Sequence, residues 1–338
     1  MIRDARVLDP EFVPRDIVHR DAEVNALSNA LDPITEGEHG KTTFLFGPSG
    51  TGKTCIARYT VEQLREAVID ITTQYINCWQ NYSRFRVLYE ILSAIGRTVD
   101  IHRQSTPADL LLERIQNHDG SPYVIVLDEV DQLEDKDVLY DLYMTRGISI
   151  VMIANREEDL FAQLDERLVS RLHASRRIRF ERYGMDDLVA ILQARVDRGL
   201  TPDAIDDEDL RFIADAAAGD ARIAIATLRE AARTADRDGL THIPSETVRE
   251  ALPNARETLQ QKSLDRLKPH QRTLYEIIEE CGEIDPGELY GQYQERTSSP
   301  KSKRTIRKYL QKLAAYDLIV AEGEKRGRTY RLSGSVER

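Results

Sequence analysis

One eight-residue run constrains the fold of this chain more than any other part of the sequence. Residues 47–54 read Gly-Pro-Ser-Gly-Thr-Gly-Lys-Thr and fit the pattern G-x-x-x-x-G-K-[ST]. The run 42–46 before it predicts a short buried strand, and apolar spacing from Ile56 to Leu64 predicts a helix after it. Glycines let backbone N–H groups converge on phosphate oxygens, and a helix N-terminus favours an anion. The run therefore predicts a phosphate-binding loop rather than an ordinary glycine-rich turn.

The side chains of this loop indicate which groups would bind a nucleotide. The Lys53 ammonium suits the β- and γ-phosphates, and the Thr54 hydroxyl suits Mg²⁺. The other expected nucleotide contacts in this part of the chain are Gly50, Thr51, Gly52 and Cys55.

Two carboxylates follow the strongest strand pattern. Residues 123–127 are apolar throughout, as expected for a central parallel strand, and Asp128 and Glu129 come next. A carboxylate at the C-terminal end of such a strand lies beside the phosphate loop. We expect Asp128 to hold Mg²⁺ through water and Glu129 to polarise the attacking water as a general base. Asp131 fits a helix N-cap as well as a catalytic role.

Further polar residues follow the next apolar strand, residues 149–154. Asn155 comes directly after it, where a side-chain amide can orient water near the γ-phosphate. Arg167 and Arg171 lie four apart on one predicted helical face. Each of them fits either a surface ion pair or a contact with the γ-phosphate of the same or a neighbouring subunit.

The order of these patterns predicts the architecture. Strands at 42–46, 74–78, 123–127 and 149–154 alternate with helices such as 83–99 and 106–117. This alternation predicts an α/β domain with a parallel sheet. From Met185 to about Leu252 the pattern is all-helical, and the polar stretch 253–262 predicts a linker. The expected domains are residues 1–183, 184–258 and 259–338.

The helical region offers three further candidates for nucleotide contacts. Residues 219–224 open a helix with Arg222 in its first turn, where a cation is disfavoured unless an anion lies near. A nucleotide phosphate would be such an anion. Tyr183, just before the helical region, and Arg195, in its first helix, are placed to flank the nucleotide.

The C-terminal pattern predicts a winged helix-turn-helix. A helix at 302–316 follows two shorter ones, and strands at 318–322 and 328–332 flank a basic turn. In such a domain the third helix enters the major groove, and the wing contacts the DNA backbone or minor groove. The core face of the third helix would be Ile306, Leu310 and Leu313. The expected DNA contacts are Lys303, Arg304, Thr305, Arg307, Lys308, Lys325, Arg326 and Arg328.

The charge distribution agrees with DNA binding by this segment. The whole chain has a formal charge of −11, which by itself argues against a nucleic-acid partner. Residues 296–331, however, hold eleven Lys or Arg and three Asp or Glu, a local charge of +8, which leaves −19 for the rest. Double-stranded DNA is therefore the expected partner of the C-terminal segment.

Cysteine content and hydropathy bear on the compartment. Cys55, Cys78 and Cys281 are isolated and odd in number, so they argue against a disulfide framework and a dedicated zinc site. No stretch approaches the roughly 20 apolar residues of a membrane-spanning helix. We expect a cytoplasmic protein without a membrane partner.

Several stretches together resemble a known family. They are Val13-Pro14, His19-Arg20, residues 46–54, 75–78, 126–133, 138–140 and 219–222, and the winged-helix ending. The family is the archaeal origin-recognition initiators, related to eukaryotic origin recognition complex subunit one and cell division control protein six. The resemblance implies an α/β AAA+ P-loop ATPase with an α-helical lid, followed by a winged helix-turn-helix domain. It also implies ATP or ADP and Mg²⁺ as cofactors.

The resemblance implies roles for single residues. Asn155 matches the sensor-one position and Arg222 the sensor-two position, while Tyr183 and Arg195 match nucleotide-contacting positions of the lid. The residues that lie where the family surrounds the adenine are Val18, His19 and Arg20. The resemblance implies an arginine finger at Arg171 or Arg167 and leaves the choice between them open.

The helices between residues 83 and 117 occupy the place where the family carries an insertion that also touches DNA. The candidates there are Tyr82, Arg84, Arg86, Arg97 and Arg103. The same arginines fit ion pairs with acidic residues of the chain outside 296–331 equally well.

The expected function is that of an ATP-dependent DNA replication initiator, a slow ATPase that uses hydrolysis as a switch. Double-stranded origin DNA is the expected partner, and the resemblance adds recruitment of the replicative helicase and self-association on DNA. An ATP-gated winged-helix transcription regulator or a non-initiating paralogue is the alternative.

Overall fold

The computed structural model of the chain describes residues 1–102, 105–118, 120–316, 318–323 and 327–333. These residues form two compact units, Met1–Leu252 and Pro253–Arg338.

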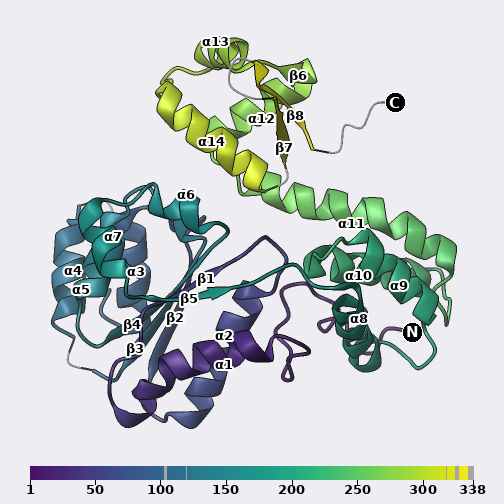
Figure 1. The fold of residues 1–338 in the computed structure, drawn as a ribbon, viewed down its shortest axis with the longest axis horizontal. Coiled ribbons are helices and arrows are strands. Elements are labelled where there is room, and N and C mark those ends of the chain that lie inside the picture. Colours follow the sequence, from purple (N-terminus) through teal and green to yellow (C-terminus); the bar gives the residue numbers. More distant parts are fainter. Residues whose placement is uncertain (103–104, 119, 317, 324–326, 334–338) are drawn as a thin grey trace. The chain divides into compact units, whose positions relative to one another are not determined.

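The first unit is built around a parallel sheet (Figure 1). Its elements before the lid are α1 (Asp21–Leu31), η1 (Asp32–Glu36), β1 (Thr43–Phe46), α2 (Lys53–Ala67), β2 (Thr72–Asn77), α3 (Arg84–Ala94), α4 (Ala108–Gln116), β3 (Tyr123–Asp128), η2 (Val130–Gln132), α5 (Asp137–Met144), β4 (Ile148–Ala154), α6 (Glu157–Phe161), α7 (Glu166–Leu172) and β5 (Arg176–Arg179). The strand order is β2-β3-β4-β1-β5, and every neighbouring pair is parallel. The predicted parallel α/β architecture is confirmed.

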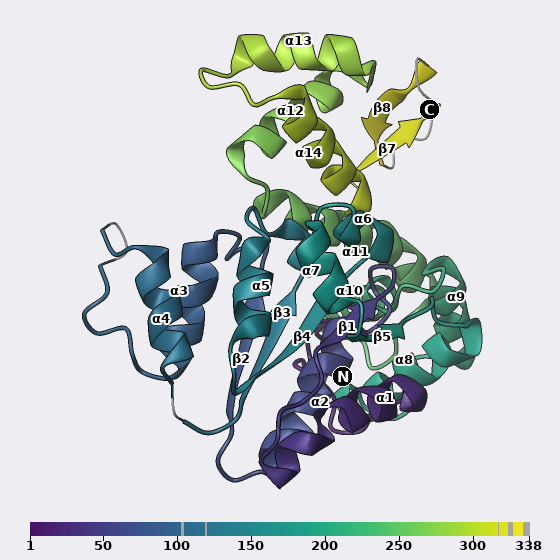
Figure 2. The same cartoon turned by 60° about the vertical axis from the view of Figure 1, so that its left-hand side comes forward.

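Both faces of this sheet are covered, which explains its continuous apolar strands (Figure 2). Ile125 and Met152 pack toward α3, α4 and α5, while Val126 and Val151 pack toward α1 and α2. All residues of β3 are buried, including Asp128 at its end. The sheet therefore carries a charged group on a rigid, buried strand end.

Two helices of the sheet domain are shorter than predicted. The helix expected at 83–99 is α3, which ends at Ala94. Gly96 adopts a left-handed conformation with φ 69°, which terminates the helix. The helix expected at 106–117 is α4, Ala108–Gln116.

Strand β5 is an element that the sequence pattern does not indicate. Its residues read Arg-Arg-Ile-Arg, and only Ile178 is buried. Pairing with β1 in parallel register makes these residues a strand. Arg177 and Arg179 both pair with Glu157, at 2.6 and 2.9 Å. Tertiary pairing has overridden a polar local pattern here.

The lid follows as the helices α8 (Met185–Gly199), α9 (Asp207–Ala216), α10 (Ala221–Arg237) and the first part of α11 (Ser245–Asp265), up to Leu252. The all-helical prediction from Met185 to Leu252 is confirmed. The N-terminal residues pack on these helices: Leu8 is 1% exposed in the lid core, and the amides of Arg3 and Asp4 donate to the Gly199 carbonyl. Residues far apart in the sequence thus share one core.

The predicted linker at residues 253–262 is wrong, because α11 runs without interruption from Ser245 to Asp265. Pro253 lies inside this helix and removes one backbone hydrogen bond from it. The residues after it are mostly good helix formers, such as Ala, Arg, Glu, Leu, Gln and Lys, so the helix continues.

The second unit contains α12 (Pro269–Cys281), β6 (Glu283–Ile284), α13 (Pro286–Arg296), α14 (Lys303–Ala315), β7 (Ile319–Glu322) and β8 (Thr329–Leu332). The strands form an antiparallel sheet in the order β6-β8-β7. Asp285 caps α13 with Pro286 at its first position, and Ile306, Leu310 and Leu313 of α14 are buried, as predicted. The unit is a winged helix in which β6 adds a strand to the expected hairpin.

The three cysteines are free. Over the described ranges, no helix combines the length and the apolar character needed to cross a membrane.

Replacement of Leu8 by Ala tests the packing of the N-terminal residues on the lid. We expect the lid helices to lose about 2–5 kcal/mol of local stability, because a buried leucine leaves a cavity. Hydrogen exchange of the α8–α10 amides measures this loss. Ile69→Ala is the control, since Ile69 is fully exposed and its loss is expected to change stability by less than about 0.5 kcal/mol. Equal effects of the two variants would contradict this packing.

Candidate functional site

The glycine-rich loop lies between β1 and α2 as predicted, and the lid closes on it. Gly50 and Gly52 adopt left-handed conformations, with φ 76° and 92°. A Cβ at Gly50 would overlap the Asp220 carboxylate, and one at Gly52 would meet the Tyr183 hydroxyl. Glycine is therefore required at both positions for conformation and for close approach.

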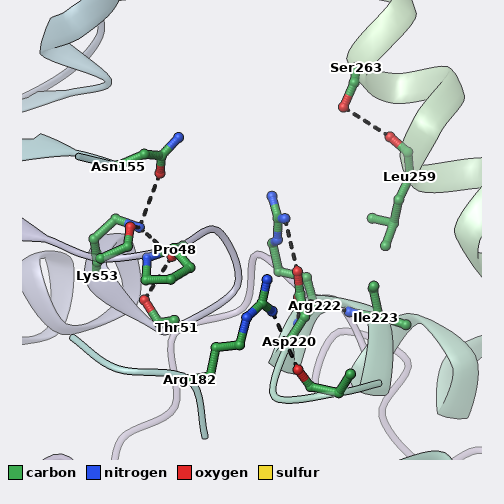
Figure 3. A network of polar contacts seen from close by, with 12 residues as sticks. Pro48, Thr51, Lys53, Asn155, Arg182, Asp220, Arg222, Ile223, Leu259 and Ser263 are labelled. Carbon is green, nitrogen blue, oxygen red and sulfur yellow. Dashed lines mark hydrogen bonds and ion pairs between the residues drawn. The ribbon is translucent and has the colours of Figure 1, made fainter. Parts of the chain in front are cut away.

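Lys53 is folded back onto the loop. Its Nζ donates to the carbonyls of Gly47 and Pro48, each at 2.6 Å, and to Asn155 Oδ1 at 3.3 Å. Figure 3 shows Lys53 and Asn155 pointing toward each other from α2 and from the loop after β4. Burial lowers the pKa of Lys53 to about 8, even though Asp128 lies near enough to oppose the shift. The structure thus brings the predicted phosphate-binding lysine and the sensor-like Asn155 together.

Thr54 and Asp128, the two expected Mg²⁺ ligands, are in direct contact. Thr54 Oγ1 donates to Asp128 Oδ2 at 2.7 Å. A hydroxyl beside one carboxylate is an oxygen donor set that suits Mg²⁺ bound largely through waters and phosphate. The described residues hold no cluster of three His, Cys, Asp or Glu side chains that would form a metal cage by themselves. The residues therefore fit a nucleotide-dependent Mg²⁺ site.

Glu129 follows Asp128 in a strained conformation, with φ 58° and ψ 47°. A non-glycine residue in this region costs on the order of 1–3 kcal/mol, and such strain clusters at functional sites. Asp131 does not cap a helix: it lies inside η2, and the N-cap of α5 is Lys136.

The start of α10 is in direct contact with the loop. The Ala221 amide donates to the Gly50 carbonyl at 3.0 Å. Asp220 caps α10 by accepting from the amides of Arg222 and Ile223, at 2.8 and 3.2 Å, and it also pairs with the Arg222 guanidinium at 3.1 Å (Figure 3). The positive charge of Arg222 is close enough to contribute to the lowered pKa of Lys53. Arg222 thus lies near the loop, and in this structure the anion that it pairs with is the Asp220 carboxylate.

The residues expected around the adenine gather beside Tyr183. The Arg20 guanidinium lies 4.2 Å from the Tyr183 ring centroid, pairs with Glu23 at 2.6 Å and donates to the Glu181 carbonyl. His19 Nδ1 lies 3.3 Å from the Asp187 carboxylate at the start of α8. Val18, directly before them, is half-buried. These contacts join the segment at 18–20 to the lid.

Arg195 contacts an earlier part of the N-terminal segment, in a way that the sequence does not reveal. Its Nη1 donates to the Val7 carbonyl at 2.7 Å, its Nη2 donates to the Phe12 carbonyl at 3.1 Å, and its guanidinium lies over the Phe12 ring. Burial lowers the pKa of Arg195 and raises that of the nearby Cys55 thiol. Arg195 therefore binds the backbone of the N-terminal segment, and its nucleotide contact stays a prediction.

The two arginine-finger candidates lie together on α7. Both are exposed, and their guanidinium groups lie over the Tyr140 ring, Arg171 at 5.1 Å and Arg167 at 5.8 Å. Arg167 also pairs with Asp165 at 3.2 Å. The choice between them stays open.

The arginines at 84–97 behave differently from one another. Arg84 pairs with Asp109 at 2.7 Å and with Asp141 at 2.9 Å. For this arginine the alternative prediction, an ion pair with acidic residues of the same chain, is confirmed. Arg86 lies over the Tyr82 ring, and Arg97 is exposed. Arg103 lies outside the described residues.

The helix α14 presents the expected basic face. Lys303, Arg304, Arg307 and Lys308 are exposed. Thr305 is half-buried, and its hydroxyl lies 3.0 Å from that of the capping Ser302. In the wing, Arg328 is exposed, while Lys325 and Arg326 lie outside the described residues.

Two residues at the site were not predicted. Asp220 could have been found, because an Asp directly before a helical pattern is a common N-cap. Tyr75 on β2 donates its hydroxyl to Asp128 Oδ2 at 2.7 Å, and burial of that hydroxyl together with the carboxylate charge raises its pKa. Residues 75–78 belong to the stretches that resemble the family, but no local pattern shows that Tyr75 contacts Asp128.

Comparison with known families agrees with this geometry. Residues 36–174 match the AAA domain family, and residues 189–252 match the Cdc6 AAA+ ATPase-type lid domain.

Known proteins match over nearly the whole chain. The chain is 51% identical to ORC1-type DNA replication protein 9 of Halobacterium salinarum, over 99% of this chain and 95% of that protein. It is 53% identical to ORC1-type DNA replication protein 1 of the same organism, over 91% of this chain and all of that protein. The solved structure of the Aeropyrum pernix ORC1 protein in complex with DNA matches with a TM-score of 0.77 and 27% identity, over 98% of this chain and 93% of that one.

The buried ammonium of Lys53 gives a pH prediction. A phosphate binds protonated Lys53 better, and in the free protein the Lys53 pKa is about 8. Nucleotide affinity should therefore be constant below pH 8 and fall above it, by up to about tenfold per pH unit until the pKa of the complex is reached. Titration with a fluorescent ADP analogue from pH 7 to pH 9.5 measures this.

Lys53→Met is the matched variant: it should bind weakly and lose the pH dependence. A wild-type affinity that stays flat from pH 7 to 9.5 would show that Lys53 does not contact the phosphates.

Proposed function

The chain belongs to the Orc1/Cdc6 family of AAA+ ATPases, which includes the ORC1-type DNA replication proteins, and from this premise we propose that it is an ATP-dependent initiator of DNA replication. The observation that carries the proposal is the contact of the lid with the phosphate loop. The amide at the start of α10 donates to the Gly50 carbonyl, and the charge of Arg222 is near enough to help lower the pKa of Lys53. A lid in this position can respond to the nucleotide that the loop holds.

We propose the following roles at the nucleotide. Lys53 exchanges the carbonyls of Gly47 and Pro48 for the β- and γ-phosphates, a stronger, charge-assisted contact. Thr54 and Asp128 would hold Mg²⁺, which would neutralise charge that develops on the phosphates. Glu129 takes the proton of the attacking water, and the Asn155 amide orients that water.

Arg222 of the lid would contact the γ-phosphate and so make the position of the lid depend on the bound nucleotide. Its guanidinium now pairs with Asp220, which itself lies against Gly50. A phosphate at the loop adds negative charge close to the Asp220 carboxylate, so it favours a move of Arg222 from Asp220 to the phosphate. Loss of the γ-phosphate reverses that preference, which makes slow hydrolysis a switch rather than a motor.

The winged helix would supply DNA binding. Exposed Lys and Arg side chains on α14 suit the phosphates flanking a major groove, and Arg304 lies early in the helix, where side chains reach bases. The related Aeropyrum pernix ORC1 protein has been solved in complex with DNA. We propose double-stranded origin DNA as the target and the cytoplasm as the location. Helicase recruitment and self-association on DNA, with Arg171 or Arg167 at the neighbouring nucleotide, complete the proposal.

Footprinting on genomic DNA tests this function. With ATP, protection should concentrate at one or a few repeat-bearing, AT-rich regions, and the pattern should change when ADP replaces ATP. Protection at many promoters instead would favour a transcription regulator and would contradict initiation.

Glu129→Gln tests the catalytic assignment. Removal of the general base should lower ATP turnover by about 10²–10⁴-fold and leave ATP binding intact, so that ATP accumulates on the protein. Single-turnover hydrolysis and retained nucleotide measure the two effects. Glu158→Gln, an exposed carboxamide change on α6, should leave both unchanged. Normal turnover in Glu129→Gln would exclude Glu129 as the base.

Arg307→Ala tests the DNA-binding face. If Arg307 contacts a phosphate, its loss should weaken binding to all sequences alike and reduce the slope of log K against log salt by about 1. Arg296→Ala is the charge-matched control, because Arg296 is already paired with Glu280 at 2.6 Å. A loss confined to one DNA sequence would assign Arg307 to base contacts instead.

A further inference from the structure

We propose that Tyr75 is a positioning residue for Asp128, whose carboxylate it holds in the orientation that binds Mg²⁺. The inference rests on the proposed ATPase function of this site. It concerns how the chain keeps one buried carboxylate ready for a metal that arrives with the nucleotide.

The sheet register places Tyr75 where its hydroxyl can reach the end of the neighbouring strand. β2 pairs with β3 so that Tyr75 is opposite Val126 and Asn77 is opposite Asp128. The Tyr75 side chain spans this two-residue offset, and its hydroxyl donates to Asp128 Oδ2 at 2.7 Å. On α2, the Arg58 guanidinium lies 5.5 Å from the Tyr75 ring centroid, so the ring also has a neighbour on the helix that carries Thr54.

Two hydroxyl donors converge on one carboxylate oxygen. Thr54 Oγ1, on helix α2, donates to the same Oδ2 at 2.7 Å. Hydrogen bonds to a charged acceptor are stronger than neutral ones, so together they restrain rotation of the carboxylate. Oδ1 accepts no hydrogen bond from the residues that the structure describes. It is therefore the oxygen left for the water shell of the metal.

Because the Asp128 carboxylate is buried, the loss of one of its two donors should change its orientation. Asp128 is only 5% exposed, so solvent cannot replace a lost donor freely. Without the Tyr75 hydroxyl, the carboxylate keeps Thr54 as its only side-chain donor among the described residues and becomes free to turn away from the metal. Nucleotide binding without Mg²⁺ should not change, because the loop amides and Lys53 hold the phosphates and neither contacts Tyr75.

Tyr75→Phe removes only the hydroxyl. We measure the binding of a fluorescent ADP analogue in excess EDTA, and then the binding of Mn²⁺ to the ADP complex by electron paramagnetic resonance. We expect an unchanged ADP affinity in EDTA and a rise of about fivefold or more in the Mn²⁺ concentration for half-saturation.

Tyr123→Phe is the matched control. Tyr123 begins β3, which Asp128 ends, and its hydroxyl donates to the Ile91 carbonyl of α3 at 2.8 Å, so its loss should leave Mn²⁺ affinity unchanged. In an Asp128→Asn background the Tyr75→Phe change should add no further loss, since the carboxylate it positions is gone.

Two results would overturn the inference. Unchanged Mn²⁺ affinity in Tyr75→Phe would show that the hydroxyl does not position the carboxylate, and a weakened ADP affinity in EDTA would assign Tyr75 a general structural role. A wild-type chain that binds no ADP in either condition would refute the proposed ATPase function itself, which is a distinct outcome.

Discussion

The register of three parallel strands determines where the phosphate loop, the strand-end carboxylates and Asn155 lie. Phe46 of β1 is paired with Ala154 of β4, so the residues that follow, Gly47 and Asn155, are neighbours, and the Gly47 amide donates to the Asn155 carbonyl. β4 in turn pairs with β3, which ends at Asp128. Because parallel strands end at one edge of the sheet, the loop, the carboxylates and the amide meet there without any long-range loop excursion. A shift of one residue in this register would turn the side chains of the shifted strand to the other face and displace the groups that follow it.

The site carries charged and strained groups that the fold must hold in place. The Lys53 ammonium is buried among carbonyls, and its lowered pKa expresses the cost of that burial. Glu129 has a left-handed conformation, and the buried Asp128 carboxylate accepts hydrogen bonds from two hydroxyls. Anionic phosphates with Mg²⁺ would supply the partners that these groups suit best, so the arrangement favours a loop that is completed by its nucleotide.

The lid and the N-terminal segment contribute a second layer of organisation. The N-terminal residues pack into the lid core, and Arg195 of the lid binds two of their backbone carbonyls. The same segment then leads to Arg20, which stacks on Tyr183. Motion of the lid would therefore carry the adenine-side residues with it, and this couples the base and the phosphate ends of the proposed nucleotide site.

The sequence by itself determined the phosphate loop, the strand-end carboxylates, the parallel α/β order, the helical lid and the winged helix, because each has a local pattern of spacing or polarity. It also placed the +8 charge on the segment that holds α14. Only the tertiary structure decided which arginines bind other parts of the chain. Arg84, Arg177 and Arg195 are the same residue type, and folding gives each a different partner: Asp109, Glu157 and the Val7 carbonyl. The same holds for β5, which is a strand through its pairing with β1, and for α11, which continues through Pro253 against the local signal. Tyr75 shows the reason most directly: its link to Asp128 joins residues 53 positions apart, and no local pattern can encode a contact that depends on strand register.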